Sequence, residues 1–260
     1  MILLSNDDGI LASGLWTLAD ELKKIDRVVV AAPDREQSAT GTGITLRQPL
    51  RVQKIASPAS NVDAYMIEGT PGDSIILALG KLLQDKIDIV VSGINSGPNL
   101  GDDVLISGTV GAALQGYLRN LPAIAISVAS INPDNLAPAA RLTSLIVERI
   151  KAGILPGDVF LNINVPDKPL TQIKGITITQ PAHRTHIDTV EKGNDGKRDY
   201  YWLVRRKLDT HVPRGSDIWA LEQGYISITP LQNTLFRRPA PHMSKEFCSM
   251  LLCELQDSAP

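Results

Sequence analysis

The sequence predicts an α/β protein built on a doubly wound, mostly parallel sheet, with a C-terminal β-hairpin extension and a closing helix. Short apolar runs alternate with segments of helical periodicity through the first two thirds of the 260 residues. This alternation indicates parallel strands joined by right-handed helical crossovers. After Pro166 the pattern changes to strands around polar turns. A chain of this length, with 43% hydrophobic residues, can bury a large core.

A series of apolar runs is expected to form the strands. The run Arg27–Ala32 consists almost entirely of valine and alanine, which is typical of a strand buried on both faces. The expected strands are Met1–Ser5, Arg27–Ala32, Val52–Ile55, Ala64–Glu68, Ile87–Ser92, Ala123–Val128 and Val159–Val165.

Helices are expected between these runs. Apolar residues recur on one helical face of Ser13–Ile25. A second helix should begin after Thr70, because Thr70 suits the cap, Pro71 the first turn and Asp73 the positive end of the helix dipole. Two further helices are expected at Thr109–Arg119 and Ala137–Ala152.

The C-terminal third is expected to form an arm and a closing helix. Two strands, Ile173–Thr179 and Tyr200–Arg206, flank the polar stretch 191–198, which suits a hairpin tip. A strand at Gly224–Thr229 follows, and then the closing helix Ser244–Leu255 after the stiff joint Arg238–Pro241. We therefore divide the chain into a core (1–170), a hairpin and oligomerisation extension (171–235) and a C-terminal helix (236–260) that we expect to be exchanged between subunits.

The overall charge and composition exclude several classes of partner. The net charge of −2 gives no reason to expect a nucleic acid or an anionic membrane as a partner. No apolar run approaches the roughly 18–20 residues that a bilayer span requires. Two acids follow the first strand at once, unlike a signal peptide, and Cys248 and Cys253 cannot form a disulfide framework. We expect a cytoplasmic protein.

Polar segments that follow the predicted strands are the candidates for a site. Ligands of open α/β sheets bind outside the carboxyl ends of the strands, where segments distant in sequence can meet. Three segments directly follow strands and the fourth opens a helix. They are Asn6–Gly9, Pro33–Ser38, Gly93–Asn99 and Ser107–Thr109.

The first segment suggests a cation site. Asp7 and Asp8 can converge on one ion because Gly9 allows a sharp turn, and two adjacent carboxylates repel each other unless a proton or a cation intervenes. Ser38 and Asn95 would add neutral oxygen donors. An oxygen-only set suits a hard cation such as Mg²⁺ or Mn²⁺. The structural alternative is a loop in which one aspartate caps the helix near Ser13.

The last segment suggests a phosphate site. Small residues at a helix start expose backbone N–H groups and direct the positive end of the dipole toward an anion. The hydroxyl groups of Ser107 and Thr109, on either side of Gly108, would supply further donors. The alternative is a capped helix whose glycines only permit close packing on the sheet.

Five motifs together resemble those of one known family. They are Ile2-Leu3-Leu4-Ser5-Asn6-Asp7-Asp8-Gly9-Ile10, Ala32-Pro33-Asp34-Arg35-Glu36-Gln37-Ser38, Gly69-Thr70-Pro71-Gly72-Asp73, Ser92-Gly93-Ile94-Asn95-Ser96-Gly97-Pro98-Asn99-Leu100-Gly101 and Ser107-Gly108-Thr109-Val110-Gly111-Ala112-Ala113. In their order and spacing they resemble the SurE (survival protein E) family of 5′/3′-nucleotidases, which implies a Rossmann-like sheet. Departures at Gly72, Ile106 and Gln115 concern substrate preference.

The resemblance implies a set of site residues. One divalent cation, Mg²⁺ or Mn²⁺, would be held by Asp7, Asp8, Ser38 and Asn95. The substrate phosphate would lie near Asn95, Ser107, Gly108 and Thr109. The C-terminal third resembles the family only loosely. Members of the family form homodimers or homotetramers by exchanging C-terminal segments, so the resemblance implies the same assembly here.

The resulting functional hypothesis is a phosphomonoesterase. It would hydrolyse nucleoside 5′- and 3′-monophosphates with a metal-activated water, and some family members also trim short polyphosphate. Asp7 or Asp8 would orient the water as the catalytic acid pair. The alternatives are a non-catalytic nucleotide-binding module and a receiver-like signalling module, which also places paired acids after its first strand. A receiver keeps a phosphoacceptor aspartate after a later strand, where this chain has Asn95.

Overall fold

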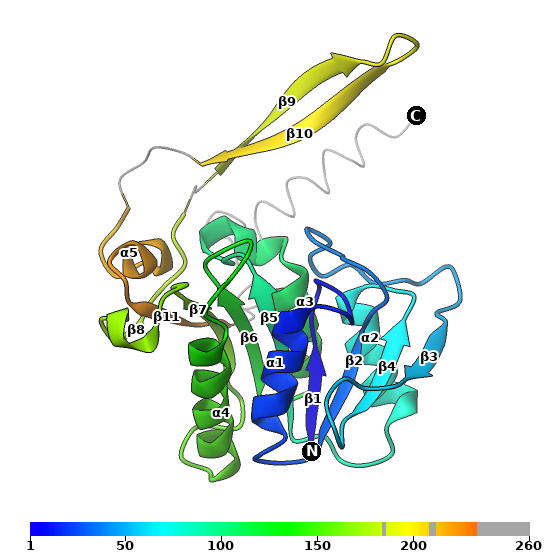
Figure 1. Cartoon of the computed structure of the whole chain (residues 1–260), viewed down its shortest axis with the longest axis vertical. Coiled ribbons are helices and arrows are strands. Elements are labelled where there is room, and N and C mark those ends of the chain that lie inside the picture. The colour runs from blue at the N-terminus through cyan, green and yellow to red at the C-terminus, as the bar shows by residue number, and fades with distance from the viewer. Residues whose placement is uncertain (184–185, 208–211, 233–260) are drawn as a thin grey trace, which may run out of the picture. The chain divides into compact units, whose positions relative to one another are not determined.

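A nine-stranded sheet organises the part of the chain that the structure describes. The computed structural model describes residues 1–183, 186–207 and 212–232 (Figure 1). The strands of this sheet are β1 Ile2–Ser5, β2 Val28–Pro33, β3 Val52–Ile55, β4 Asp63–Ile67, β5 Ile89–Ser96, β6 Ala123–Val128, β7 Phe160–Val165, β8 Ile176–Ile178 and β11 Ile226–Pro230. Their order along the sheet is β3-β4-β2-β1-β5-β6-β7-β11-β8.

The centre of the sheet is parallel and its margins are mixed. From β4 to β7 each strand pairs with its neighbour in parallel. At one margin β3 runs antiparallel to β4. At the other, β11 runs antiparallel to β7 and pairs in parallel with β8. The prediction of a doubly wound, mostly parallel sheet is therefore confirmed.

The helices begin and end close to the predicted positions. They are α1 Ser13–Leu22, α2 Pro71–Leu77, α3 Gly108–Tyr117, α4 Ala137–Lys151 and α5 Asp217–Glu222, with a π-helical turn at Ala78–Leu82 and 3₁₀ turns at Gly101–Leu105 (η2) and Leu170–Gln172. The predicted cap of α2 is confirmed. The Thr70 hydroxyl oxygen accepts a hydrogen bond from the Asp73 amide at 3.0 Å, and the Asp73 carboxylate accepts one from the Thr70 amide at 2.9 Å.

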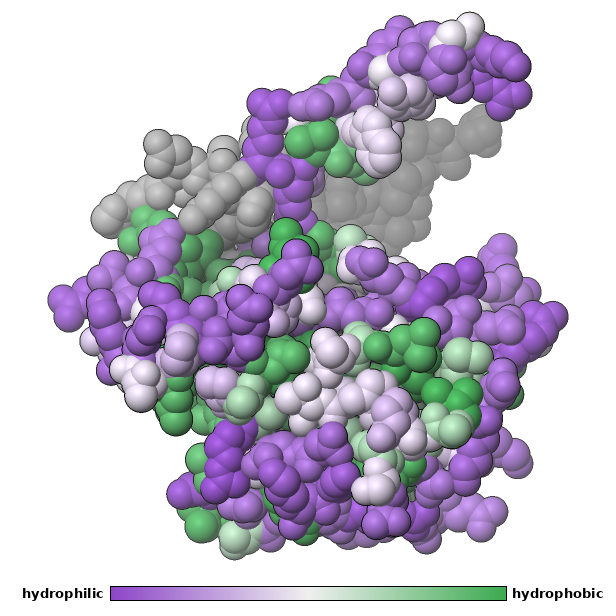
Figure 2. Space-filling model, viewed as in Figure 1, coloured by the Kyte–Doolittle hydropathy of each residue, from purple (hydrophilic) through white to green (hydrophobic). Residues whose placement is uncertain are grey.

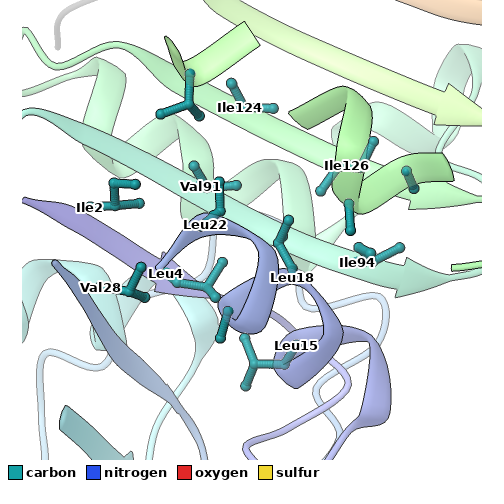
Figure 3. Packing of buried hydrophobic residues seen from close by; sticks show 14 of the residues in the cluster. Ile2, Leu4, Leu15, Leu18, Leu22, Val28, Val91, Ile94, Ile124 and Ile126 are labelled. Atoms are coloured by element: carbon teal, nitrogen blue, oxygen red, sulfur yellow. The ribbon is translucent and has the colours of Figure 1, made fainter. Parts of the chain in front are cut away.

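Two apolar layers cover the two faces of the sheet. On one face, α1 and α4 pack over alternate strand residues such as Leu4 and Ile126; Figure 3 shows Leu15, Leu18 and Leu22 of α1 in this layer. On the other face, residues of α2 and α3 pack over the intervening strand positions. Strand alternation thus gives each helix layer its own apolar surface.

One crossover has the opposite hand to the others, so the prediction of uniformly right-handed crossovers is wrong. α1 and α4 pack against each other on one face (Figure 1). α1 leads from β1 to β2, toward the β3 margin, whereas α4 leads from β6 to β7, toward the β8 margin. Parallel strands joined in opposite directions over one face give crossovers of opposite hand.

The polarity of the sheet explains where α4 lies. On the face that α4 covers, β6 and β7 present apolar side chains, including Ile126 and Ile163. The opposite positions of the same strands carry Ser127, Asn162 and Asn164, all fully buried. An apolar helix face gains more by covering the apolar side, and this gain outweighs the usual preference of hand.

The C-terminal hairpin differs from the prediction in one of its two strands. β9 (His186–Asn194) pairs with β10 (Asp199–Lys207) as a separate antiparallel sheet. Residues 176–178, within the segment expected to supply the first strand, instead form β8 of the main sheet. The pairing was predicted wrongly because the sequence of β9 is mostly polar, so no apolar run marks it as a strand. The tip of the hairpin is hydrophilic (Figure 2), while Trp202 and Leu203 of β10 are exposed.

The chain divides into two compact units, Met1–Pro230 and Leu231–Pro260. All the elements given above belong to the first. The joint Arg238–Pro241, the helix Ser244–Leu255 and both cysteines lie outside the described residues, so the expectations about them remain predictions. Among the described helices, none combines the length and hydropathy of a bilayer-crossing segment.

Candidate active site

The acid pair lies where the strand order of the sheet reverses direction. β1 is hydrogen-bonded to β2 on one side and to β5 on the other. From β1 the chain continues toward the β3 margin, and from β5 it continues toward the β8 margin. Asp7 and Asp8 directly follow β1, and Asn95 lies near the end of β5. Two of the predicted polar segments therefore meet at the topological switch point, where open α/β sheets bind ligands.

Asp7 is buried and links three of the segments. Its side chain is 4% exposed, and its Oδ1 atom accepts a hydrogen bond from the Thr109 hydroxyl. Its backbone carbonyl accepts a hydrogen bond from the Gln37 amide at 2.7 Å, next to Ser38. Burial raises the pKa of Asp7 to about 6; the charge of Asp8 adds to this, and the Thr109 hydrogen bond opposes it.

Asp8 is half-buried and faces the end of β5. Its Oδ2 atom accepts a hydrogen bond from the Ser96 amide at 3.0 Å. Burial also raises the pKa of Asp8, the Ser96 hydrogen bond lowers it, and the nearby Glu36 carboxylate raises it. Gly9, with φ of +94°, turns the chain directly after the pair, as the sequence predicted.

The structural alternative for the acid pair is excluded. Ala12 occupies the cap position of α1, and no side chain makes a capping hydrogen bond there. Neither Asp7 nor Asp8 therefore serves as a helix cap.

The two neutral oxygen donors are placed differently. Asn95 is 9% exposed, and β6 fixes its backbone through pairing with Ser127. Its side-chain amide donates to the Gly97 carbonyl at 2.7 Å, which leaves Oδ1 as the atom that could face a cation. Ser38 is exposed, and its hydroxyl donates to Glu36 Oε1 at 2.8 Å. Ser38 is linked to the acid pair indirectly. Its partner Glu36 lies near Asp8, and the amide of the neighbouring Gln37 donates to the Asp7 carbonyl.

The start of α3 packs directly on Asp7. A Cβ atom at Gly108 would lie 2.7 Å from Asp7 Cβ and 2.9 Å from Asp7 Oδ2. A Cβ at Gly111 would lie 2.1 Å from the Gly41 carbonyl oxygen, where the loop carrying Ser38 crosses the helix. The Ser107 hydroxyl caps the helix by accepting from the Val110 amide at 3.1 Å. Capping and close glycine packing are therefore both present, and the helix start adjoins the acid pair.

The donor set fits a hard divalent cation. It consists of two carboxylates, an amide oxygen and a hydroxyl, without a thiol or imidazole. The raised pKa values of Asp7 and Asp8 arise with no contribution from a cationic side chain among the described residues. Two ionised carboxylates in such a place need a positive partner. The residues that would hold the cation are Asp7, Asp8, Ser38 and Asn95.

Two features of the site were not predicted from the sequence. Glu36 lies in one of the motifs without a predicted role, yet its charge acts on Asp8. Asn162 and Asn164 of β7 hold the loop that follows Asn95, through Asn99. The signal was present in the sequence, because β7 reads Phe-Leu-Asn-Ile-Asn-Val and a buried strand rarely alternates asparagine with apolar residues.

Fold and site together define a doubly wound α/β protein whose candidate site combines paired carboxylates with a helix N-terminus. Residues 2–188 match the family model described as survival protein SurE. The chain belongs to the SurE family.

Relatives and a solved structure agree with this membership. The chain is 56% identical to the 5′-nucleotidase SurE of Dehalococcoides mccartyi strain CBDB1, over 92% of this chain and 91% of that protein. It is 43% identical to the 5′-nucleotidase SurE of Alkalilimnicola ehrlichii, with the same coverage. The crystal structure of the SurE protein from Aquifex aeolicus superposes with a TM-score of 0.75 at 34% identity, covering 98% of this chain and 99% of that chain.

Proposed function

We propose that the protein hydrolyses the phosphate ester of nucleoside 5′- and 3′-monophosphates and depends on one divalent cation, Mg²⁺ or Mn²⁺. Relatives that align over nearly the whole chain are named 5′-nucleotidases. The observation that carries the proposal is the contact of Asp7 with Gly108 and Thr109. The contact supports the proposal because Asp7, which would bind the cation, then adjoins a helix start that would bind the phosphate, and phosphoryl transfer uses the two together.

Each residue of the site has a defined part in this proposal. The N–H groups at the start of α3 and the hydroxyl of Ser107 donate to phosphoryl oxygens, while the Thr109 hydroxyl, which donates to Asp7 Oδ1, orients that carboxylate. The acid pair takes a proton from the attacking water, and Asp8 is the more exposed member. Water adds its oxygen to phosphorus while the bond to the ribose oxygen breaks, and the leaving oxygen takes up a proton. When bound, a divalent cation would polarise a phosphoryl oxygen and lower the pKa of water.

Phosphate release separates the proposal from its rivals. Nucleoside 5′-monophosphates, 3′-monophosphates, short polyphosphate and a chromogenic aryl phosphate are incubated with Mg²⁺, Mn²⁺ or chelator. We expect turnover of both nucleotide isomers with a cation and none with chelator. Binding of nucleotide without turnover would instead favour a non-catalytic module. Transient labelling of an aspartate by a small phosphodonor would favour a receiver.

We also propose that the protein is a homodimer or homotetramer assembled through its C-terminal third. The described part of this region supports the proposal through the exposed apolar residues Tyr201, Trp202 and Leu203 on β10. A two-stranded hairpin is marginally stable by itself. Light scattering on the full chain and on a chain truncated after Leu235 tests the proposal. A monomeric full chain, or a truncated chain with the same number of subunits per particle, would contradict it.

A further inference from the structure

The loop 96–106, which joins the acid-pair side of the site to its phosphate side, is held by side chains of β6 and β7. Asn95 precedes the loop and Ser107 follows it, so the conformation of residues 96–106 relates the acid-pair side to the phosphate side. The first bond of this loop is the Ser96 amide to Asp8. Its middle is bound by side chains of β6 and β7, strands that contribute no other residue to the site described above.

Four hydrogen bonds converge on Asn99. Its amide N–H donates to Asn164 Oδ1 at 2.8 Å. Its carbonyl oxygen accepts from the side-chain amides of both Asn164, at 2.9 Å, and Asn162, at 2.8 Å. Its own side-chain amide donates to the Ser127 hydroxyl oxygen at 2.9 Å. Asn164 thus makes two hydrogen bonds to the Asn99 backbone, one with its N–H group and one with its carbonyl oxygen.

These bonds lie in the interior. Asn162, Asn164 and Ser127 are fully buried, and Asn99 is 8% exposed. The Oδ1 atom of Asn162 is buried without a hydrogen-bond partner among the described residues. A buried, unpaired acceptor costs stability, so packing alone does not account for asparagine at this position. The hydrogen bond from the Asn162 side-chain amide to the Asn99 carbonyl accounts for it.

The fixed loop leads directly to the start of α3. Two residues after Asn99, the Gly101 amide donates to the buried carboxylate of Asp217 at 2.8 Å. The 3₁₀ turn η2 begins there, and the Ser107 amide donates to the Asp103 carbonyl at 3.0 Å. Asn95, in contrast, is held independently by the pairing of β5 with β6. Release of Asn99 should therefore disturb the phosphate side more than the cation side.

We propose that Asn164, assisted by Asn162 and Ser127, is a positioning residue of the reaction, which sets the phosphate-binding start of α3 relative to the acid pair through Asn99. It touches no reacting atom. That Asn164 serves this reaction rests on the proposed function. That Asn164 holds the loop rests on the hydrogen bonds alone.

The test compares Asn164→Ala with a control that loses a similar bond elsewhere. Thr143 is buried in α4 and its hydroxyl donates to the Ala139 carbonyl at 2.8 Å, so Thr143→Val removes a buried side-chain to backbone bond away from the site. Ser127→Ala is a milder variant that breaks only one of the four bonds at Asn99 and serves if Asn164→Ala does not fold. Melting temperature, kcat and KM for a nucleoside 5′-monophosphate, and calorimetric binding of Mn²⁺ and of inorganic phosphate to the Mn²⁺-loaded protein are measured.

We expect Asn164→Ala to lose at least tenfold in kcat/KM and in phosphate affinity, with Mn²⁺ affinity within about threefold of the parent. Ser127→Ala should show a smaller loss of the same kind. Thr143→Val should lower the melting temperature and leave both affinities unchanged. Parental kcat/KM and phosphate affinity in both Asn164→Ala and Ser127→Ala, or equal losses in Thr143→Val, would overturn the inference. If the parent binds phosphate without turnover, the proposed function fails, and the phosphate affinities still decide the positioning role.

Discussion

The contact between Gly108 and Asp7 can be tested by the addition of one methyl group. In Gly108→Ala the new Cβ would lie 2.7 Å from Asp7 Cβ and 2.9 Å from its Oδ2 atom. Carbon atoms in contact are normally about 3.5–4.0 Å apart, so Asp7 or the start of α3 must move by about 1 Å. A displacement of that size within a reacting geometry costs about 100-fold in rate. We therefore expect kcat/KM to fall by about two orders of magnitude.

Gly80→Ala is the matched control for this substitution. A Cβ at Gly80 meets no atom of the described residues within 4 Å, and Gly80 is also helical. Alanine there should leave activity unchanged and stabilise the fold by up to about 1 kcal/mol. Steady-state phosphate release, calorimetric titration with Mn²⁺ and thermal melts are measured for both variants. If Gly108→Ala has the kcat/KM and cation affinity of the parent, the packing of α3 on Asp7 does not set the site.

Three further perturbations address the acid pair and its neighbours. Asp8→Asn should weaken Mn²⁺ binding by several kcal/mol and nearly abolish turnover with the fold intact, because an oxygen-only site depends on its charges; full activity in chelator would contradict this. Thr109→Val should reduce kcat/KM by about 10- to 100-fold, which corresponds to a lost charge-assisted hydrogen bond of about 1.5–3 kcal/mol; unchanged kinetics would make Thr109 a structural residue only. Burial raises the pKa of Asp7 from 3.8 to about 6, so between these values the folded state binds more protons than the unfolded state. The stability of the cation-free protein should therefore fall as pH rises through this window, by up to about 3 kcal/mol. Urea unfolding in chelator at stepped pH measures this slope, which Asp7→Asn should flatten; an equally steep slope in that variant would assign it to another group.

Local patterns predicted the regular part of the fold. The run Arg27–Ala32 became β2, buried throughout, and Thr70 capped α2 as its side chain suggested. These predictions succeed because they depend on burial periodicity and on bonds within a few residues. The partners of the C-terminal strands could not be obtained in this way. β8 is a strand as expected, but its choice of β11 as partner is a long-range pairing that no local pattern contains.

The site was partly predictable for the same reason. Paired acids before Gly9 and small residues around Gly108 are visible in the sequence, and the strand-end rule brings them together. The direct contact between Asp7 and Gly108 depends on how far α3 slides along the sheet. That position is set by backbone contacts such as Gly111 against the Gly41 carbonyl, which only the three-dimensional structure shows.

Because side chains alternate between the two faces of β7, its two sets of positions should tolerate different substitutions. At Leu161, Ile163 and Val165, which face the α1–α4 layer, another aliphatic residue of similar volume should be accepted at little cost. At Asn162 and Asn164 the partner is a backbone amide or carbonyl of Asn99, and an isosteric aspartate would present an oxygen where a donor is required. A saturation library across this strand should therefore show a tolerance profile with a period of two residues. In an enzyme engineered for a new substrate, the aliphatic positions would be open to stabilising redesign while the asparagines stay fixed.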